Sequence, residues 1–196
     1  MDEPSAPPVV ELDELLAAEY NYIAQTANQA HEDRARVSSF YLIAVGSLLA
    51  ALFGTQFFMS DSFDPTVSIM FSGLFFLLTL LGISTILQLA RLRAAWYESM
   101  LAMNQLKDFM IGQSSDLAGA FRWKTSTLPS KYKKNSVSYY QAVEVALIGG
   151  LMSGAGIFFL LQALFQRTLI VHWPASAIFG VLTVLLQLKL YKWSLK

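Results

Sequence analysis

Residues 144 to 161 of the chain read EVALIGGLMSGAGIFFLL, a glutamate followed by an uncharged run with four glycines. The uncharged run continues to Gln166, and about 20 apolar residues are enough for a helix to cross the hydrocarbon core of a bilayer. Glycines on a membrane helix allow the backbone of a second helix to come close. The stretch therefore predicts a transmembrane helix that packs closely against a partner.

The composition of the whole chain indicates the same class of protein. Hydrophobic residues make up 55% of the 196 residues, charged residues make up 14%, and the mean hydropathy is +0.45. These values are too apolar for an ordinary soluble domain of this size. We predict an all-α, polytopic membrane protein.

Four segments are long and apolar enough to cross a membrane. They are Phe40–Met59, Pro65–Ala90, Val145–Gln166 and Pro174–Tyr191, and only the last contains a charged residue, Lys189. A lysine near the end of a membrane helix can extend its ammonium group to the membrane surface. We expect four transmembrane helices in two hairpins, over residues 40–90 and 139–193.

The basic residues are distributed unevenly around these four segments. Thirteen of the fourteen fall before the first segment, between the second and third, or at the end of the chain, and Arg167 falls on the other side. Loops that stay in the cytoplasm retain Lys and Arg. We therefore expect a protein of the cell (plasma) membrane whose N-terminus, C-terminus and central segment are all cytoplasmic.

The residues outside the hairpins divide into cytoplasmic segments. We expect a disordered lead over residues 1–8, a helix over 9–39, a helical segment with a basic connector over 91–138, and a tail over 194–196. Apolar residues at helical spacing in the central segment are Leu92, Trp96, Met100, Met103, Leu106 and Met110. This stripe either packs against the N-terminal helix or binds a partner, since thioethers adapt to irregular surfaces.

Small residues form matching stripes on two of the predicted membrane helices. Gly150 and Gly154 form a G-x-x-x-G pair on the third, and Gly46, Ala50 and Gly54 follow the same spacing on the first. Such faces pack closely. Either the two stripes meet within one chain, or one of them meets its copy in a homo-oligomer.

Glu144 lies immediately before the third segment, at the edge of the membrane, where an acidic group is costly and is usually paired. Gln88, Gln187 and Lys189 fall at a similar depth near the inner surface. We expect these four residues to form one polar layer. The alternative is that Glu144 couples the movement of protons or cations.

Three lysines, Lys131, Lys133 and Lys134, precede the third segment. Basic residues beside a membrane attract anionic lipid headgroups, at about 1 kcal/mol for each residue, and they also act as a topology signal. The chain has no broad basic face of the kind that binds nucleic acid. We expect the lipid bilayer, and not nucleic acid, as a partner.

The chain lacks the sequence motifs of enzymes and cofactor sites. It contains no cysteine, no G-x-S-x-G, no P-loop and no H-E-x-x-H. Adjacent residues such as His31, Glu32 and Asp33 diverge around a helix and do not converge on a metal ion. We predict a protein that is not an enzyme, with no catalytic, cofactor-binding or metal-binding residues.

Residues 9–112, with a two-span hairpin between cytoplasmic helices, resemble in their arrangement the bacterial two-span effector proteins called SLATT domains. That resemblance implies a pore-forming role, and the second hairpin departs from the pattern. From the residues themselves we predict a non-enzymatic integral membrane scaffold or accessory subunit. Its cytoplasmic helices would bind a membrane-protein partner or associate into a homo-oligomer. The alternative is an oligomeric pore-forming or membrane-perturbing effector.

Overall fold

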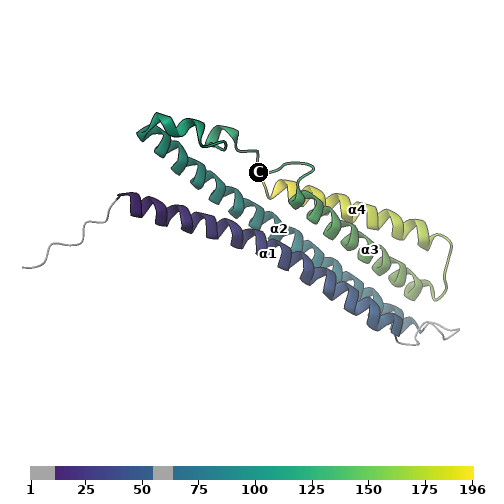
Figure 1. The fold of residues 1–196 in the computed structure, drawn as a ribbon. Coiled ribbons are helices and arrows are strands. Elements are labelled where there is room, and N and C mark those ends of the chain that lie inside the picture. Colours follow the sequence, from purple (N-terminus) through teal and green to yellow (C-terminus); the bar gives the residue numbers. More distant parts are fainter. Residues whose placement is uncertain (1–11, 55–63) are drawn as a thin grey trace, which may run out of the picture. The chain divides into compact units, whose positions relative to one another are not determined.

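The computed structural model describes residues 12–54 and 64–196 (Figure 1). The predicted lead over residues 1–8 and the connector that follows the first membrane segment lie outside the described residues. Within the described ranges every regular element is a helix and no strand occurs. The all-α prediction is confirmed for this part of the chain.

Four long helices account for most of the described chain. They are α1 (Leu12–Gly54), α2 (Pro65–Gln113), α3 (Val137–Phe165) and α4 (His172–Trp193), with the 3-10 helices η2 (Ser115–Gly119) and η3 (Thr125–Thr127) between α2 and α3. Each of the four long helices is long and apolar enough to cross a membrane. The fold fits the predicted multi-pass membrane protein.

The chain divides into two compact units. The first comprises residues 1–31 and 95–130, and the second comprises residues 32–94 and 131–196. Helices α1 and α2 contribute to both units, because neither helix is interrupted where the units divide. Each predicted cytoplasmic helix is therefore continuous with a predicted membrane helix.

The core of the second unit is built from all four long helices. Phe71 and Phe75 of α2 pack against Phe159 of α3, with ring centroids 5.3 and 5.6 Å apart. Ser72 donates a 2.9 Å hydrogen bond to the carbonyl oxygen of Gly156. Other core residues are Tyr41 and Val45 of α1, Leu78, Ile86, Leu89 and Ala90 of α2, Ala142, Val145, Ala146 and Met152 of α3, and Tyr191 and Leu195 at the end of the chain.

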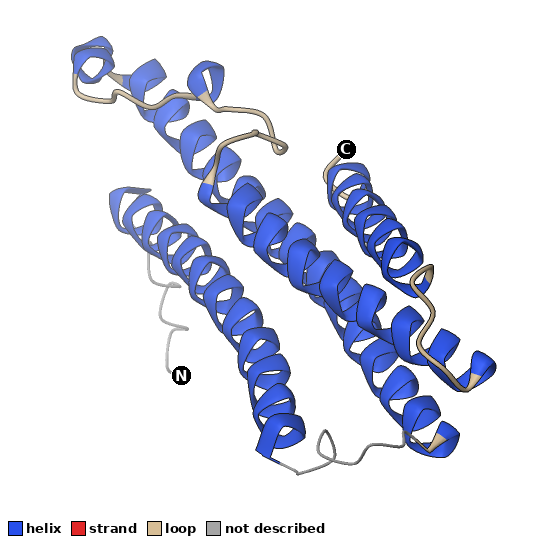
Figure 2. Ribbon diagram, turned by 90° about the vertical axis from the view of Figure 1, so that its right-hand side faces the viewer, coloured by secondary structure: helices blue, strands red, loops and turns tan. Residues whose placement is uncertain are grey.

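Local sequence explains the ends of the helices in this unit. Pro65 begins α2, where its missing N–H costs nothing, and Asp64 Oδ1 accepts a 2.9 Å hydrogen bond from the N–H of Thr66. The side chain of Ser136 caps the N-terminus of α3. Gln166, in the left-handed conformation at φ 50°, ends α3. A short connector follows, so α3 and α4 lie side by side (Figures 1 and 2).

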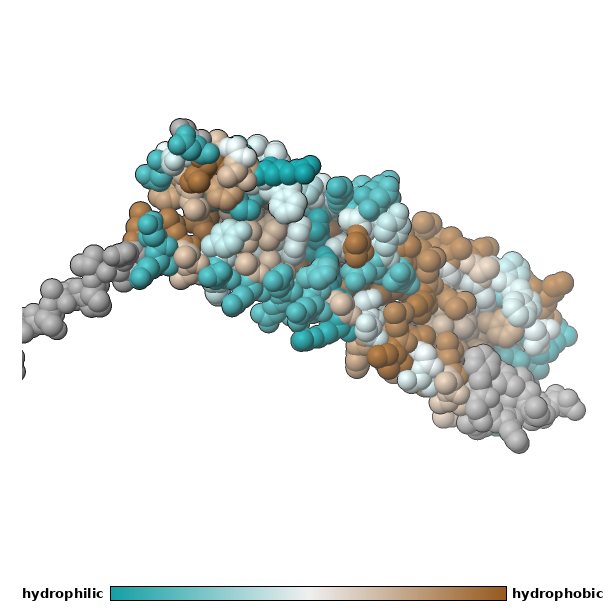
Figure 3. Space-filling model, in the orientation of Figure 1, coloured by the Kyte–Doolittle hydropathy of each residue, from teal (hydrophilic) through white to brown (hydrophobic). Residues whose placement is uncertain are grey.

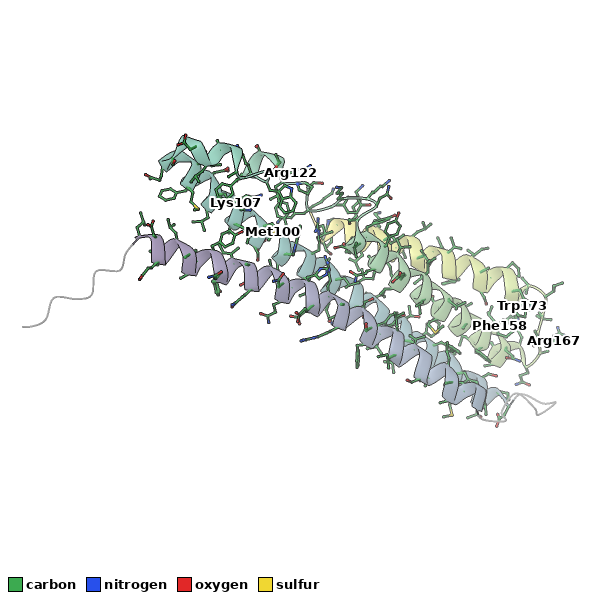
Figure 4. The ribbon with its side chains drawn as sticks, viewed as in Figure 1. Met100, Lys107, Arg122, Phe158, Arg167 and Trp173 are labelled. Carbon is green, nitrogen blue, oxygen red and sulfur yellow. The ribbon has the colours of Figure 1, made fainter. Side chains whose placement is uncertain are left out.

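The first unit pairs the beginning of α1 with the end of α2. Lys107 Nζ lies 6.0 Å from the centroid of the Tyr20 ring, and Met100 and Lys107 lie on the side of α2 that faces α1 (Figure 4). Met103 is buried, and Trp96, Met100, Leu106 and Met110 of the same apolar stripe are half-buried. Other buried residues of this unit are Ile23, Ala27 and Ala30 of α1 and Ser99 and Asn104 of α2.

Two hydrogen bonds attach η3 to α2 in the first unit. Asn104 Nδ2 donates a 3.1 Å bond to the carbonyl oxygen of Lys124. Asp108 Oδ2 accepts a 3.3 Å bond from the N–H of Thr125. Polar side chains of α2 therefore hold the segment that follows it against the helix.

Candidate functional site

Helices α3 and α4 meet at glycines. A Cβ atom added to Gly150 would lie 2.7 Å from the carbonyl oxygen of Gly180, and one added to Gly154 would lie 2.9 Å from that of Ser176. Real Cβ atoms essentially never come within 3.0 Å of another heavy atom, so glycine alone fits at both positions. The G-x-x-x-G face of α3 is covered by α4 of the same chain.

The small-residue stripe of the first membrane segment is not the partner of that face. Gly46 and Ala50 are exposed, and nothing lies within 4 Å of a Cβ atom added to Gly46. The surroundings of Gly54, the last residue of α1, lie outside the described part of the chain. As far as the structure describes it, this stripe is open to lipid or to another chain.

The buried residues of α4 carry polar groups, and its exposed residues before Lys189 are mostly apolar. A helix in water has the opposite arrangement, whereas a helix in lipid turns its apolar side chains outward. The sequence contained a signal for this face, because spacings of four, eleven and four residues keep side chains on one side of a helix. The buried residues are His172, Ser176, Gln187 and Tyr191, and the exposed ones include Ile178, Phe179, Leu182, Leu185 and Leu186.

Polar groups also lie inside the interface between α3 and α4. Thr183 Oγ1 donates a 2.9 Å hydrogen bond to Ser153 Oγ. The buried amide of Gln187 has no hydrogen-bond partner among the described residues, and it lies against Gly149, where an added Cβ would be 2.6 Å from Nε2. Gly149 therefore provides the space that a buried glutamine needs at this level.

Aromatic rings close the interface near the connector between the two helices. The rings of Phe158 and Trp173 have centroids 4.9 Å apart, and both lie close to the connector that contains Arg167 (Figure 4). A groove of about 650 Å³ follows the interface from these rings past Gly154 and Gly180. Hydrophobic residues gather around α3 and α4 on the visible face of the second unit (Figure 3).

The predicted polar layer of Gln88, Glu144, Gln187 and Lys189 is not joined by contacts. Gln187 is buried and the other three residues are exposed. Gln88 Nε2 donates a 3.2 Å hydrogen bond to Ser84 Oγ within α2. No hydrogen bond or ion pair links the four side chains in the ranges that the structure describes. The layer stays a prediction based on depth.

Two buried arginines of the second unit connect α1 to α3 and α2 to the connector before α3. Arg34 of α1 and Arg93 of α2 are only 4% and 7% exposed. Arg34 Nη1 donates to Ser138 Oγ in the first turn of α3, and Arg93 Nε donates a 3.2 Å bond to the carbonyl oxygen of Lys131. Burial, and next the repulsion from Arg93, lowers the pKa of Arg34, and burial also lowers the pKa of Arg93. In the sequence both arginines carry only a topology signal, because nothing in their spacing indicates burial.

The basic connector reaches the end of α4. Lys133 and Lys134 are exposed, whereas Lys131 is half-buried. Lys192 Nζ of α4 lies 5.6 Å from the centroid of the Tyr132 ring. The lysines predicted to meet lipid headgroups therefore lie beside a second basic segment, which is far away in the sequence.

The first unit exposes large apolar side chains. From Leu12 to Tyr22 helix α1 has no buried residue, and Leu12 and Leu15 are 57% and 56% exposed. Phe109 and Trp123 are exposed as well. A groove of about 430 Å³ in this unit is lined by Asp13, Leu16, Ala17, Tyr20, Asn21, Met110 and Phe121.

Within the described residues, the acidic side chains and histidines do not converge on one point. No group of three or more His, Cys, Asp and Glu residues that could hold a metal ion occurs in residues 12–54 and 64–196. Glu32 and Asp33 lie 3.4 and 3.5 Å from Arg36. This part of α1 forms surface ion pairs, which contribute little to stability.

No protein-family model matches the chain, and no curated protein or solved structure is detectably similar to it. Its function has to be inferred from the chemistry and geometry of its own residues.

Proposed function

We propose that the protein is a non-enzymatic membrane scaffold or accessory subunit. Its second unit lies in the plasma membrane, and its first unit binds a protein partner, or a second copy of the chain, in the cytoplasm. The observation that carries the proposal is the beginning of α1, which is helical from Leu12 but has no buried residue before Ile23. Large apolar side chains that stay exposed, such as those of Leu12 and Leu15, mark a surface that packs against another molecule.

The chemistry of this segment limits the kind of partner. Exposed leucines at helical spacing are the residues that an amphipathic helix buries in a partner's groove. Asp13, Glu14 and Glu19 lie on the same segment and are exposed. These residues favour a partner groove with an apolar floor and a basic rim.

The polar buried face of α4 supports membrane insertion of the second unit. In lipid the exposed face of α4, with Phe179 and Leu186, meets hydrocarbon, while Gln187 stays inside the protein. The distribution of basic residues supports the cytoplasmic position of the first unit.

The same face of α4 argues against the second candidate function, an oligomeric pore. A pore needs polar residues around a water-filled axis. Ser153 and Thr183 bond to each other inside one protomer, and Gln187 is turned toward α3. The buried polar residues of α4 therefore lie inside one protomer and do not line a shared axis.

The scaffold function is tested with a single charge placed on the exposed segment. Leu15→Glu should release the partner, or dissociate the homo-oligomer, because it puts a carboxylate into an apolar contact. Gln29→Glu adds the same charge at another exposed position of α1 and should have no effect. Particle mass by light scattering in mild detergent, with quantitative mass spectrometry of co-purifying proteins, measures both results. Unchanged mass and composition for Leu15→Glu would contradict the proposal.

A further inference from the structure

A second groove lies at the end of α4, in the second unit. It has a volume of about 530 Å³ and is lined by Leu186, Lys189, Leu190, Lys192, Trp193 and Lys196. We call it the α4 lysine groove. Half of its lining residues are lysines, and the other half are large and apolar, with Leu186 and Trp193 64% and 70% exposed.

The two kinds of side chain form two neighbouring rows along the helix. Lys189 and Lys192 are three residues apart on α4, and Leu186, Leu190 and Trp193 are separated by four and three residues. Lys196 extends the basic row beyond the helix, in a turn where its N–H donates a 3.3 Å hydrogen bond to the carbonyl oxygen of Trp193. Both spacings keep side chains on one face of a helix. A molecule in the groove therefore meets a basic row and an apolar row at the same time.

The positive charge of the groove is not cancelled by nearby acids. Lys189, Lys192 and Lys196 form no ion pair with the residues that the structure describes. The C-terminal end of a helix carries only about half of a negative elementary charge, and the three lysines exceed it even when the α-carboxylate of Lys196 is added. Lys192 also lies beside Tyr132 of the basic connector, so the positive region extends beyond the groove.

The position of the groove adds the last constraint. Leu186 belongs to the apolar face of α4, whereas Lys196 follows the end of the helix. Tryptophan and lysine at the end of a membrane helix lie at the level of the lipid headgroups. The groove therefore crosses from the acyl-chain region to the headgroup region of the bilayer.

We propose that the α4 lysine groove binds an anionic phospholipid. The phosphate of the headgroup lies among Lys189, Lys192 and Lys196, and the beginning of an acyl chain lies along Leu186 and Leu190, beside Trp193. A soluble phosphate compound would use the lysines but would leave the apolar row unoccupied. The site does not depend on the scaffold function, because it involves no residue of the first unit.

Two triple variants with the same loss of charge test the site. The purified full-length protein is titrated in detergent micelles with phosphatidylglycerol and, separately, with phosphatidylcholine, and bound lipid is counted by native mass spectrometry. At about 1 kcal/mol, or roughly five-fold in affinity, for each lysine, K189Q/K192Q/K196Q should lower the affinity for phosphatidylglycerol about 100-fold. The control K131Q/K133Q/K134Q removes the same charge from the connector, whose lysines do not line the groove. It should weaken only the general attraction to the phosphate and lower the affinity less than ten-fold. Phosphatidylcholine binding should stay weak in all three proteins.

Two further measurements examine the apolar row and the source of the phosphate. Leu186→Asn leaves the charge unchanged and should lower phosphatidylglycerol affinity several-fold, with an unchanged circular dichroism spectrum. Glycerol 3-phosphate should compete only at a large excess. Equal losses in the two triple variants would overturn the proposal, since they would show a general basic field with no site. Full competition by glycerol 3-phosphate at the concentration of the lipid would also overturn it.

Discussion

The carbonyl oxygen of Gly180 lies 2.7 Å from the position that a Cβ atom of Gly150 would occupy, and the relationship is mutual. A Cβ atom on Gly180 would lie 2.9 Å from the carbonyl oxygen of Gly150. Both obstacles are backbone atoms, which cannot rotate away as the end of a side chain can. This contact sets how closely α3 and α4 approach each other.

Gly180→Ala should destabilise the protein by about 1 to 3 kcal/mol, the usual cost of overpacking a close contact. Gly46→Ala is the matched control, because the space around Gly46 is open. Alanine is favoured over glycine in a helix by about 1 kcal/mol, so the control should be neutral or stabilising. Thermal unfolding in detergent, followed by circular dichroism, measures the difference. Equal melting temperatures for the two variants would contradict the close contact between Gly180 and Gly150.

Ser138→Ala should destabilise the second unit by about 1 to 3 kcal/mol, because it removes an acceptor from the buried guanidinium of Arg34. Ser39→Ala changes the same side chain at an exposed position of α1 and should stay within about 0.5 kcal/mol of the wild type. Chemical denaturation in detergent compares the two variants. If their midpoints coincide, the Arg34–Ser138 bond contributes nothing to stability.

Glu144→Gln tests whether the acid at the beginning of α3 couples ions. Glu144 is exposed, so neutralising it should change stability by no more than about 0.5 kcal/mol. If its role is structural, partner binding and lipid binding should be unchanged as well. Proton and cation flux into liposomes provides the decisive measurement. A flux that is present in the wild type and lost in Glu144→Gln would favour the coupling alternative.

The predicted orientation is tested by single cysteines, since the chain has none of its own. Cysteine at Thr168 should react with a membrane-impermeant thiol reagent added to intact cells, whereas cysteine at Ser114 should react only after lysis. Both positions are exposed in the structure. Labelling of the Ser114 variant in intact cells would reverse the assigned topology.

Hydrophobic runs made the four helices predictable. Each run is long enough to cross a bilayer and contains almost no charge, so its helical state in lipid follows from backbone hydrogen bonding alone. The continuity of α1 and α2 was also within reach, because no proline or glycine separates the predicted cytoplasmic part of α1 from Phe40. The residues of each segment were therefore sufficient to predict the four helices and their continuity.

Which helices pack against each other was harder to predict from the sequence than the helices themselves. The glycine spacing at Gly150 and Gly154 indicates a smooth face but carries no information about its partner, and Gly46 offered the same pattern. The predicted polar layer of Gln88, Glu144, Gln187 and Lys189 rests on depth in the membrane. Depth alone does not indicate the direction in which a side chain points around its helix. Of the four residues, the structure buries Gln187.

The sequence by itself determined the class of the protein, the number of membrane-capable helices and the position of the basic residues along the chain. These properties depend on composition and on distances along the chain, so no tertiary contact is needed to derive them. Only the tertiary structure decided that Gly150 meets Gly180, that Arg34 bonds to Ser138, and that Lys192 lies beside Tyr132. The physical reason is that small and polar side chains pack equally well against several possible neighbours, and the choice among them depends on the shape of all the helices together.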